Sequence, residues 1–168
     1  LSALIFLTAL RAQTWGNDLD RVLFEVKYHP ESPRANIEVA STLVQMAQNS
    51  DSNRIILLER ACSYFSKAAK IDSYSANGLI GLLVTENKLG RPLNISVYNE
   101  AVARLAKVPM ASSTPDALVS LIKCQIDGGC VFEQPVLLEM VRVAADNVAM
   151  RQLDRARLFT EVVQLFLS

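Results

Sequence analysis

The fold is decided by three short stretches: Ser32-Pro33-Arg34-Ala35, Ser73-Tyr74-Ser75-Ala76 and Thr114-Pro115-Asp116-Ala117. Each stretch begins with a hydroxyl side chain that can accept a hydrogen bond from a free backbone N–H at the start of a helix. Two of the three continue with proline, which suits the first helical position. The hydroxyl residues stand 41 positions apart in both steps (73 − 32 = 41 and 114 − 73 = 41). A fixed interval of this size predicts a stack of similar helical hairpins.

Apolar residues recur at helical spacing along the whole chain, and no segment shows sustained alternation with period two. Gly90 and the pair Gly128-Gly129 suit the ends of helices. The sequence therefore predicts one all-α domain over residues 1–168, with about eight helices. We expect them at 3–28 (with a break at Gly16-Asn17), 33–49, 54–71, 75–89, 95–108, 115–127, 135–148 and 151–167.

The same interval relates residues inside the expected helices. Small residues at matched positions let two helix backbones approach, and large ones fill the space between hairpins. A single hairpin leaves an apolar face exposed, so the hairpins are expected to stack. The matched sets are Ala35/Ala76/Ala117, Val39/Ile80/Leu121 and Ala40/Gly81/Ile122 at a step of 41, and Ala61/Ala101 and Phe65/Leu105 at a step of 40.

Two stretches resemble the tetratricopeptide (TPR) repeat. Residues 29–40 resemble the start of its helix A, and Ala61-Cys62-Ser63-Tyr64-Phe65-Ser66-Lys67-Ala68-Ala69 resembles its helix B. The likeness is good over 30–72, moderate over 73–109 and weak over 113–148. The period exceeds the family's roughly 34 residues, mainly through the loop 48–53, and Asn36 and Asn77 stand near the place of the family's helix A aromatic residue. HEAT-like and other αα-repeats therefore stay open.

The TPR resemblance implies an αα-hairpin superhelix whose first helices line a groove for a peptide or a partner protein. The groove residues expected on this basis mix apolar and polar groups, without the basic cluster that a strongly acidic ligand needs. The alternatives are a groove filled by the first or the last helix, and a structural repeat that assembles with itself. The expected groove residues are Arg34, Ile37, Ser41, Gln45, Gly78, Leu82, Thr85, Glu86 and Lys123.

The N-terminal end is an apolar run from Leu1 to Leu10, followed by Arg11 and Trp15. Ten residues are too few to cross a bilayer, which needs about 20, and neither a basic stretch nor a cleavage site marks a signal peptide. Either the run belongs to a first helix that packs on the repeats, or residues 1–12 are the end of a transmembrane helix. In the second case Arg11 and Trp15 would lie at the membrane interface. Because the chain does not begin with methionine, we expect it to be part of a longer protein.

A second resemblance covers this apolar run, the segment 11–17 and the following residues up to Ala35. They are similar to a class of bacterial polytopic membrane proteins in which a transmembrane bundle, often glycosyltransferase-like, precedes a TPR region outside the cytoplasm. The resemblance implies a membrane-anchored protein whose present domain is periplasmic, with a cytoplasmic location as the alternative. It also implies an alternative function, as the accessory domain of a membrane-embedded glycan-transfer enzyme.

Three cysteines bear on the compartment. Cys124 and Cys130 flank a short glycine-containing segment that can bring their Cα atoms within disulfide range, and such a bond fits an oxidising compartment. The alternative is two buried thiols packed as small apolar groups. Cys62 stands beside a matched alanine and is expected in the core.

Charge and residue types argue against several functions. Seventeen basic and seventeen acidic residues cancel, which argues against nucleic acid as the main ligand. One histidine and the lack of a CxxC pair argue against a zinc site. His29 has only Glu31 nearby and is expected in a turn. No phosphate-binding loop or nucleophile motif occurs, so we expect neither catalytic residues nor a cofactor. Asn94-Ile95-Ser96 fits a glycosylation sequon, but we favour Asn94 as a helix cap.

Overall fold

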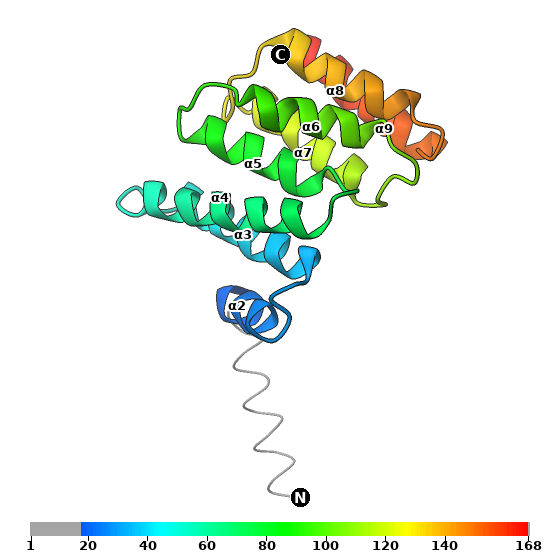
Figure 1. The fold of residues 1–168 in the computed structure, drawn as a ribbon. Helices are drawn as coiled ribbons and strands as arrows, with labels where there is room; N and C mark the ends of the chain where they lie inside the picture. The colour runs from blue at the N-terminus through cyan, green and yellow to red at the C-terminus, as the bar shows by residue number, and fades with distance from the viewer. Residues whose placement is uncertain (1–17, 168) are drawn as a thin grey trace, which may run out of the picture.

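The structure is a computed structural model that describes residues 18–167. This part of the chain holds eight α-helices and no β-strand, so the predicted all-α fold is confirmed (Figure 1). The expected start of the first helix at residue 3, and the question whether residues 1–12 end a transmembrane helix, lie outside the described residues. The helices are α2 (Asp18–Tyr28), α3 (Pro33–Gln48), α4 (Arg54–Ile71), α5 (Asn77–Lys88), α6 (Ile95–Leu105), α7 (Thr114–Ile126), α8 (Gln134–Asp146) and α9 (Gln152–Leu167).

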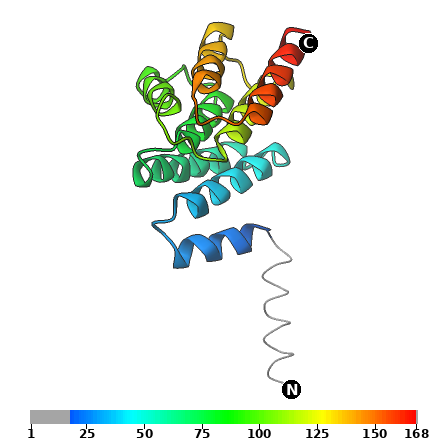
Figure 2. The same cartoon turned by 90° about the vertical axis from the view of Figure 1, so that its right-hand side faces the viewer.

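The helices follow one another along the molecule from α2 at one end to α8 and α9 at the other (Figures 1 and 2). The alternate helices α3, α5, α7 and α9 each contact the next one in this series, and α3 packs along α4 as α5 packs along α6. Among the described helices, α2 contacts α3 alone. No helix within residues 18–167 combines the length and the apolar character needed to cross a bilayer.

Most of the matched positions of the sequence lie in the core, while Gly81 and Ala117 are partly exposed. Val39, Ile80 and Leu121 are each at most 1% exposed, and Leu105 is equally buried. The buried residues form two clusters, one centred on α2, α3 and α4 and the other on α5 to α9. Burial of these side chains, each worth about 1.5–3 kcal/mol, is what holds successive hairpins together.

The structure agrees with the predicted start of α3 and differs from the predicted start of α5. Ser32 caps α3, because its Oγ accepts a hydrogen bond from the Ala35 N–H at 3.2 Å. The cap predicted at Ser73 is wrong, since α5 begins at Asn77. The Asp72 carboxylate accepts hydrogen bonds from the N–H groups of Tyr74 and Ser75, at 2.9 and 3.0 Å. This Asx turn delays the helix by one turn.

The start of α7 also differs from the prediction. Ser113 precedes the helix, and Thr114 is its first residue rather than its cap. The Thr114 side chain is buried, and its Oγ1 donates a hydrogen bond to Asn77 Oδ1 at 2.9 Å. The residues that precede the three helices are therefore 32, 76 and 113, at intervals of 44 and 37 (76 − 32 = 44 and 113 − 76 = 37). The equal interval holds for core positions and not for helix starts.

Arg104 of α6 joins the end of α4 to the turn before α5. Its Nη1 donates to the backbone oxygens of Ala69, Asp72 and Ser75 at 2.9, 2.7 and 3.1 Å. Its Nε donates to the Glu100 carboxylate at 2.9 Å, and its side chain is only 9% exposed. The positive charge thus satisfies carbonyl groups that have no partner within the helix, at the helix end where a cation is favourable.

Candidate binding groove

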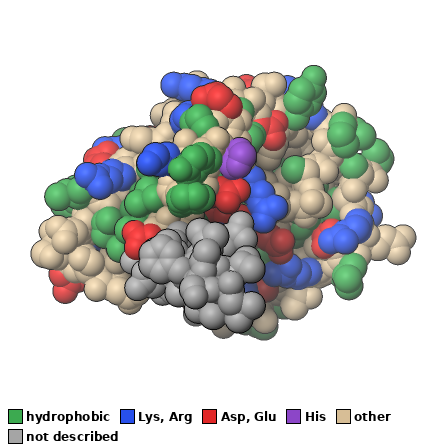
Figure 3. Space-filling model, turned by 90° about the horizontal axis from the view of Figure 1, so that it is seen from below, with side chains coloured by type: hydrophobic (Ala, Val, Ile, Leu, Met, Phe, Trp, Pro, Cys, Tyr) green, Lys and Arg blue, Asp and Glu red, His purple; other side chains and the backbone are tan. Residues whose placement is uncertain are grey.

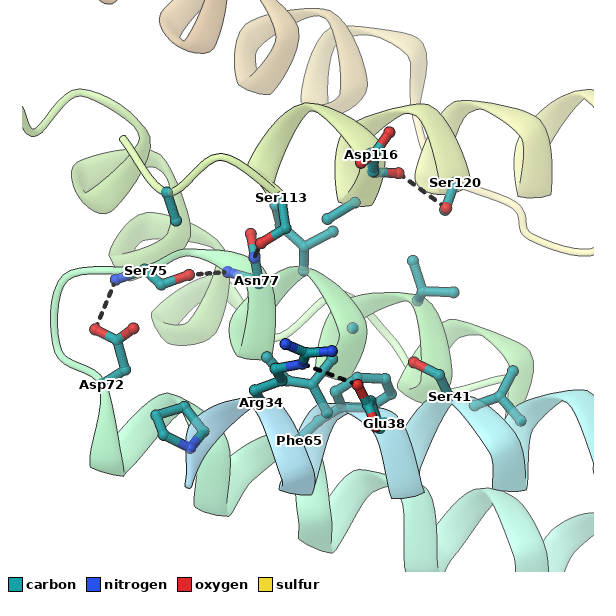
Figure 4. Close-up of a pocket in the computed structure, with 18 of the residues that line it drawn as sticks. Arg34, Glu38, Ser41, Phe65, Asp72, Ser75, Asn77, Ser113, Asp116 and Ser120 are labelled. Atoms are coloured by element: carbon teal, nitrogen blue, oxygen red, sulfur yellow. Dashed lines mark hydrogen bonds and ion pairs between the residues drawn. The ribbon is translucent and has the colours of Figure 1, made fainter. Parts of the chain in front are cut away.

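A groove of about 820 Å³ runs across α3, α5 and α7 (Figure 4). Its floor is apolar and is formed by Ile37, Val44, Ile80 and Val84, with the ring of Phe65 reaching it from α4. Ile80 and Phe65 are almost fully buried and hold the floor in place. An apolar floor inside a polar rim is the arrangement with which proteins bind peptide segments.

The rim of the groove carries charged and hydroxyl side chains. Arg34 Nε donates to Glu38 Oε1 at 3.0 Å, and the Arg34 side chain is 88% exposed. On the opposite side, Ser120 Oγ donates to the backbone oxygen of Asp116 at 2.9 Å. Figure 4 shows Arg34 and Glu38 on α3 across the groove from Asp116 and Ser120 on α7. These groups offer both donors and acceptors to a bound chain.

Asn77 joins α5 to α7 at the end of the groove where these helices begin. Its Nδ2 donates to Ser113 Oγ at 2.6 Å, and its Oδ1 accepts from Thr114 Oγ1 at 2.9 Å. Ser75 Oγ accepts from the Asn77 N–H at 3.2 Å and extends the network to the preceding turn (Figure 4). The amide of Asn77 therefore acts both as donor and as acceptor, and these two hydrogen bonds fix the spacing of α5 and α7.

The groove continues into a second depression of about 590 Å³, with Val44, Val84 and Ser120 lining both. Arg54, Lys88 and Lys123 line this depression together with Asp51, Asp127 and Cys124. Lys88 Nζ donates to the Gly129 oxygen at 3.4 Å, and burial together with the nearby Arg54 lowers the Lys88 pKa. The structure thus gathers three basic and two acidic side chains at this end of the groove.

The structure places the expected groove residues in three groups. Arg34, Ile37, Ser41 and Thr85 line the groove, with Thr85 held by its Oγ1–H bond to the Gly81 oxygen at 2.7 Å. Lys123 lies in the second depression and forms an ion pair with Glu161 at 3.6 Å. Gln45, one position beyond the groove-lining Val44, does not line the groove.

The other three expected residues lie on α5 and face elsewhere. Gly78 packs against α4, where a Cβ built on it would lie 2.7 Å from the Ala69 nitrogen. Leu82 is 8% exposed and belongs to the core cluster of α2 to α4. Glu86 lines a separate small cavity beside Arg91. The groove face of α5 consists of residues 77, 80, 81, 84 and 85, one position earlier than expected.

Sequence reasoning missed most of the other residues that line the groove, among them Asn77, Gly81, Asp116 and Ser120. Asp72 is a sequence signal for the late start of α5, since an Asp side chain often accepts hydrogen bonds from the backbone that follows it in an Asx turn. Asp116 and Ser120 follow on α7 once Asn77 is placed opposite Ser113.

Cys124 and Cys130 form a disulfide at the end of α7, with a Cα–Cα distance of 5.2 Å. The Cys130 N–H also donates to the Cys124 oxygen at 3.0 Å, so the bridge closes a short loop beside the second depression. Cys62 is free and buried. Burial, and then the charge of Glu86, raises its pKa from 9.0 to about 11, which keeps the thiol protonated at neutral pH.

Metal-ligating side chains are scattered over the described residues. Within 18–167 no group of three or more His, Cys, Asp or Glu side chains converges on a point where a metal ion would be held. His29 is exposed in the turn that follows α2.

The structure thus shows an all-α fold with an open groove lined by residues of the alternate helices α3, α5 and α7. Comparison of the chain with protein-family models, with curated proteins and with solved structures gave no match.

Proposed function

We propose that this domain is a protein-interaction module, built as a TPR-like helical repeat, that binds a peptide segment of a partner protein in the groove across α3, α5 and α7. The observation that carries the proposal is the apolar floor of Val44, Ile80 and Val84 between the polar rims of α3 and α7. Apolar side chains of a bound segment would lie on this floor, and its backbone or polar groups would bond to the rim.

The shape of the groove favours a chain segment over a compact ligand. Ligand pockets usually enclose about 300–1,000 Å³, whereas this groove of about 820 Å³ opens into a further depression of about 590 Å³. The two share Val44, Val84 and Ser120, so an extended peptide or a helix can occupy both. The equal numbers of acidic and basic residues argue against nucleic acid as the main ligand.

The contacts among alternate helices support the TPR-like part of the proposal. In a stack of αα-hairpins each repeat contacts its neighbours, and the first helices together line one face. Here α3, α5 and α7 are in contact in series and carry the groove between them.

We further propose that the domain lies outside the cytoplasm and is anchored to a membrane through the N-terminal end. The Cys124–Cys130 disulfide supports this location, because such bonds persist in oxidising compartments. The apolar run from Leu1 to Leu10, followed by Arg11 and Trp15, supports the anchor.

The groove is tested by filling it without touching the core. Ser120 on α7 is exposed and lines the groove, and its Oγ donates to the backbone oxygen four residues earlier. Ser63 on α4 is exposed, makes the same kind of bond to the Glu59 oxygen and lies outside the groove. The variants Ser120→Trp and Ser63→Trp are therefore a matched pair.

Peptides are first selected against the wild-type domain from a displayed random library, and their affinities are then measured by fluorescence anisotropy. We expect Ser120→Trp to weaken the affinity for the selected peptides at least about tenfold, which is roughly the contribution of one well-packed contact. Ser63→Trp should leave the affinity unchanged. Equal melting temperatures of the two variants exclude a folding effect. Selection of no peptide, or equal affinity in both variants, would refute the proposal.

A further inference from the structure

Helix α2 exposes an apolar surface at one end of the molecule. Its inner side holds Val22, fully buried against α3, while on its outer side Phe24 and Tyr28 are 54% and 60% exposed. Their ring centroids lie 4.5 Å apart, so the two rings form one surface, and Leu23 beside them is 38% exposed. Figure 3 views the molecule from this end and shows hydrophobic side chains gathered beside His29. A cluster of this kind marks an interaction surface more often than scattered apolar residues do.

The residue types of this surface suit a bilayer interface. Tyr28 has an apolar ring with a polar tip, and Lys27 places its Nζ 5.8 Å from the centroid of that ring. Aromatic rings beside long basic side chains are favoured at the level of the lipid headgroups, where the rings meet the acyl chains and the charged tips stay in water. Asp18, Asp20 and Glu25 outnumber Arg21 and Lys27 on α2, so the attraction is apolar rather than electrostatic.

The proposed membrane anchor would bring a bilayer close to this surface. The apolar run Leu1 to Leu10 precedes α2, and residues 11–17 between them can span at most about 25 Å when fully extended. If the run enters a membrane, α2 therefore stays within that distance of the lipid. The opposite end of the molecule, with α8 and α9, lies farthest from α2 (Figure 1).

We propose that α2 rests on the surface of a phospholipid bilayer, with Phe24 and Tyr28 inserted at the headgroup level. This contact would fix the orientation of the domain, with the α2 end on the membrane and the α8–α9 end pointing away from it. The proposal rests on the membrane location proposed above and is independent of what the groove binds.

The test measures depth directly with a tryptophan reporter, because Trp15 is the single tryptophan of the chain. The whole chain, with Trp15→Phe, receives either Phe24→Trp on α2 or Phe159→Trp on α9. The second is a control of similar exposure, since Phe159 is 49% exposed and lies on α9 at the other end of the molecule. Each variant is mixed with phosphatidylcholine vesicles whose acyl chains are brominated near the headgroup, and wild-type Trp15 is followed in parallel.

We expect the emission of the Phe24→Trp variant to shift to shorter wavelength and to be quenched at least about twofold more than that of the Phe159→Trp variant, with little dependence on salt. Quenching of Trp15 without quenching in the Phe24→Trp variant would overturn the α2 contact and leave the membrane location standing. If neither Trp15 nor the tryptophan of the Phe24→Trp variant is quenched, both the α2 contact and the membrane location are overturned. Equal quenching of the Phe24→Trp and Phe159→Trp variants would also overturn the proposal. So would a dimer in solution that Phe24→Ser abolishes, because it would assign this surface to a second copy of the chain.

Discussion

Replacement of Gly78 by alanine tests the close approach of α5 to α4, on which the position of the groove depends. A Cβ at this residue would lie 2.7 Å from the Ala69 nitrogen, 2.9 Å from the Phe65 oxygen and 3.1 Å from the Ala69 Cα. All three neighbours are backbone atoms of α4. No rotation of a side chain relieves such a contact, so the two helices must move apart.

Two opposing terms determine the size of the effect. Alanine in place of glycine within a helix contributes about 1 kcal/mol of stability through propensity. Overpacking usually costs about 1–3 kcal/mol and occasionally more, and the upper end applies here because the contacts are with backbone. Separation of the helices also strains the bond from Arg104 to the Ala69 oxygen. We expect a net loss of about 2 kcal/mol, which lowers the melting temperature by about 4–8 °C for a chain of this size.

Gly81 on the same helix provides the comparison. A Cβ at Gly81 would lie 2.3 Å from a ring atom of Phe65, so its obstacle is a side chain. Replacement of Phe65 by leucine should therefore relieve much of the cost of Gly81→Ala and little of the cost of Gly78→Ala. Urea unfolding followed by circular dichroism gives the free energies of the single and double variants, and a double-mutant cycle isolates the coupling. A Gly78→Ala variant as stable as the wild type would refute the close approach and the assigned face of α5.

Two further predictions concern Arg104 and Cys62. Arg104→Met removes the cation from three backbone oxygens. It should lower the free energy of unfolding, measured in urea, by about 2–4 kcal/mol, and Arg104→Lys should lower it less. A loss below about 0.5 kcal/mol for Arg104→Met would contradict the assigned role. The pKa of Cys62 is raised to about 11, so the unfolded chain releases this proton first as the pH rises. Stability should therefore fall between pH 9 and 11 more steeply in the wild type than in Cys62→Ala, as followed by thermal unfolding, and equal slopes would count against a buried thiol.

Local sequence signals were sufficient for the helices, whose predicted and observed bounds agree closely for α3 and α4. They failed where a distant residue ends a helix. The expected end of α6 at residue 108 is wrong, because the helix stops at Leu105. The Asn147 amide, which follows α8, donates to the oxygens of Leu105 and Lys107 at 2.8 and 2.7 Å. Such a cap is invisible until the fold brings residues 40 positions apart together.

The site was less predictable than the fold, because a groove depends on helical phase. A shift of one position rotates a residue by about 100° around a helix. The groove face of α5 lies one position earlier than expected, so Gly78 is in the contact with α4 and Asn77 lies in the groove. The group of charged side chains at one end of the groove was hidden for a different reason. Arg54, Lys88 and Lys123 come from three helices and form no cluster in the sequence.

Gly81 links the packing of α5 against α4 to the shape of the groove. Gly81 lines the groove, and the Phe65 ring from α4 fills the space that a side chain at residue 81 would take. The ring thereby becomes part of the apolar floor while staying 6% exposed. A larger residue at 81 would displace the ring and raise the floor at the same time. The hollow between α3 and α7 therefore results from the same close approach that stabilises the stack, and variants that relieve the packing at Gly81 must also change what the groove can hold.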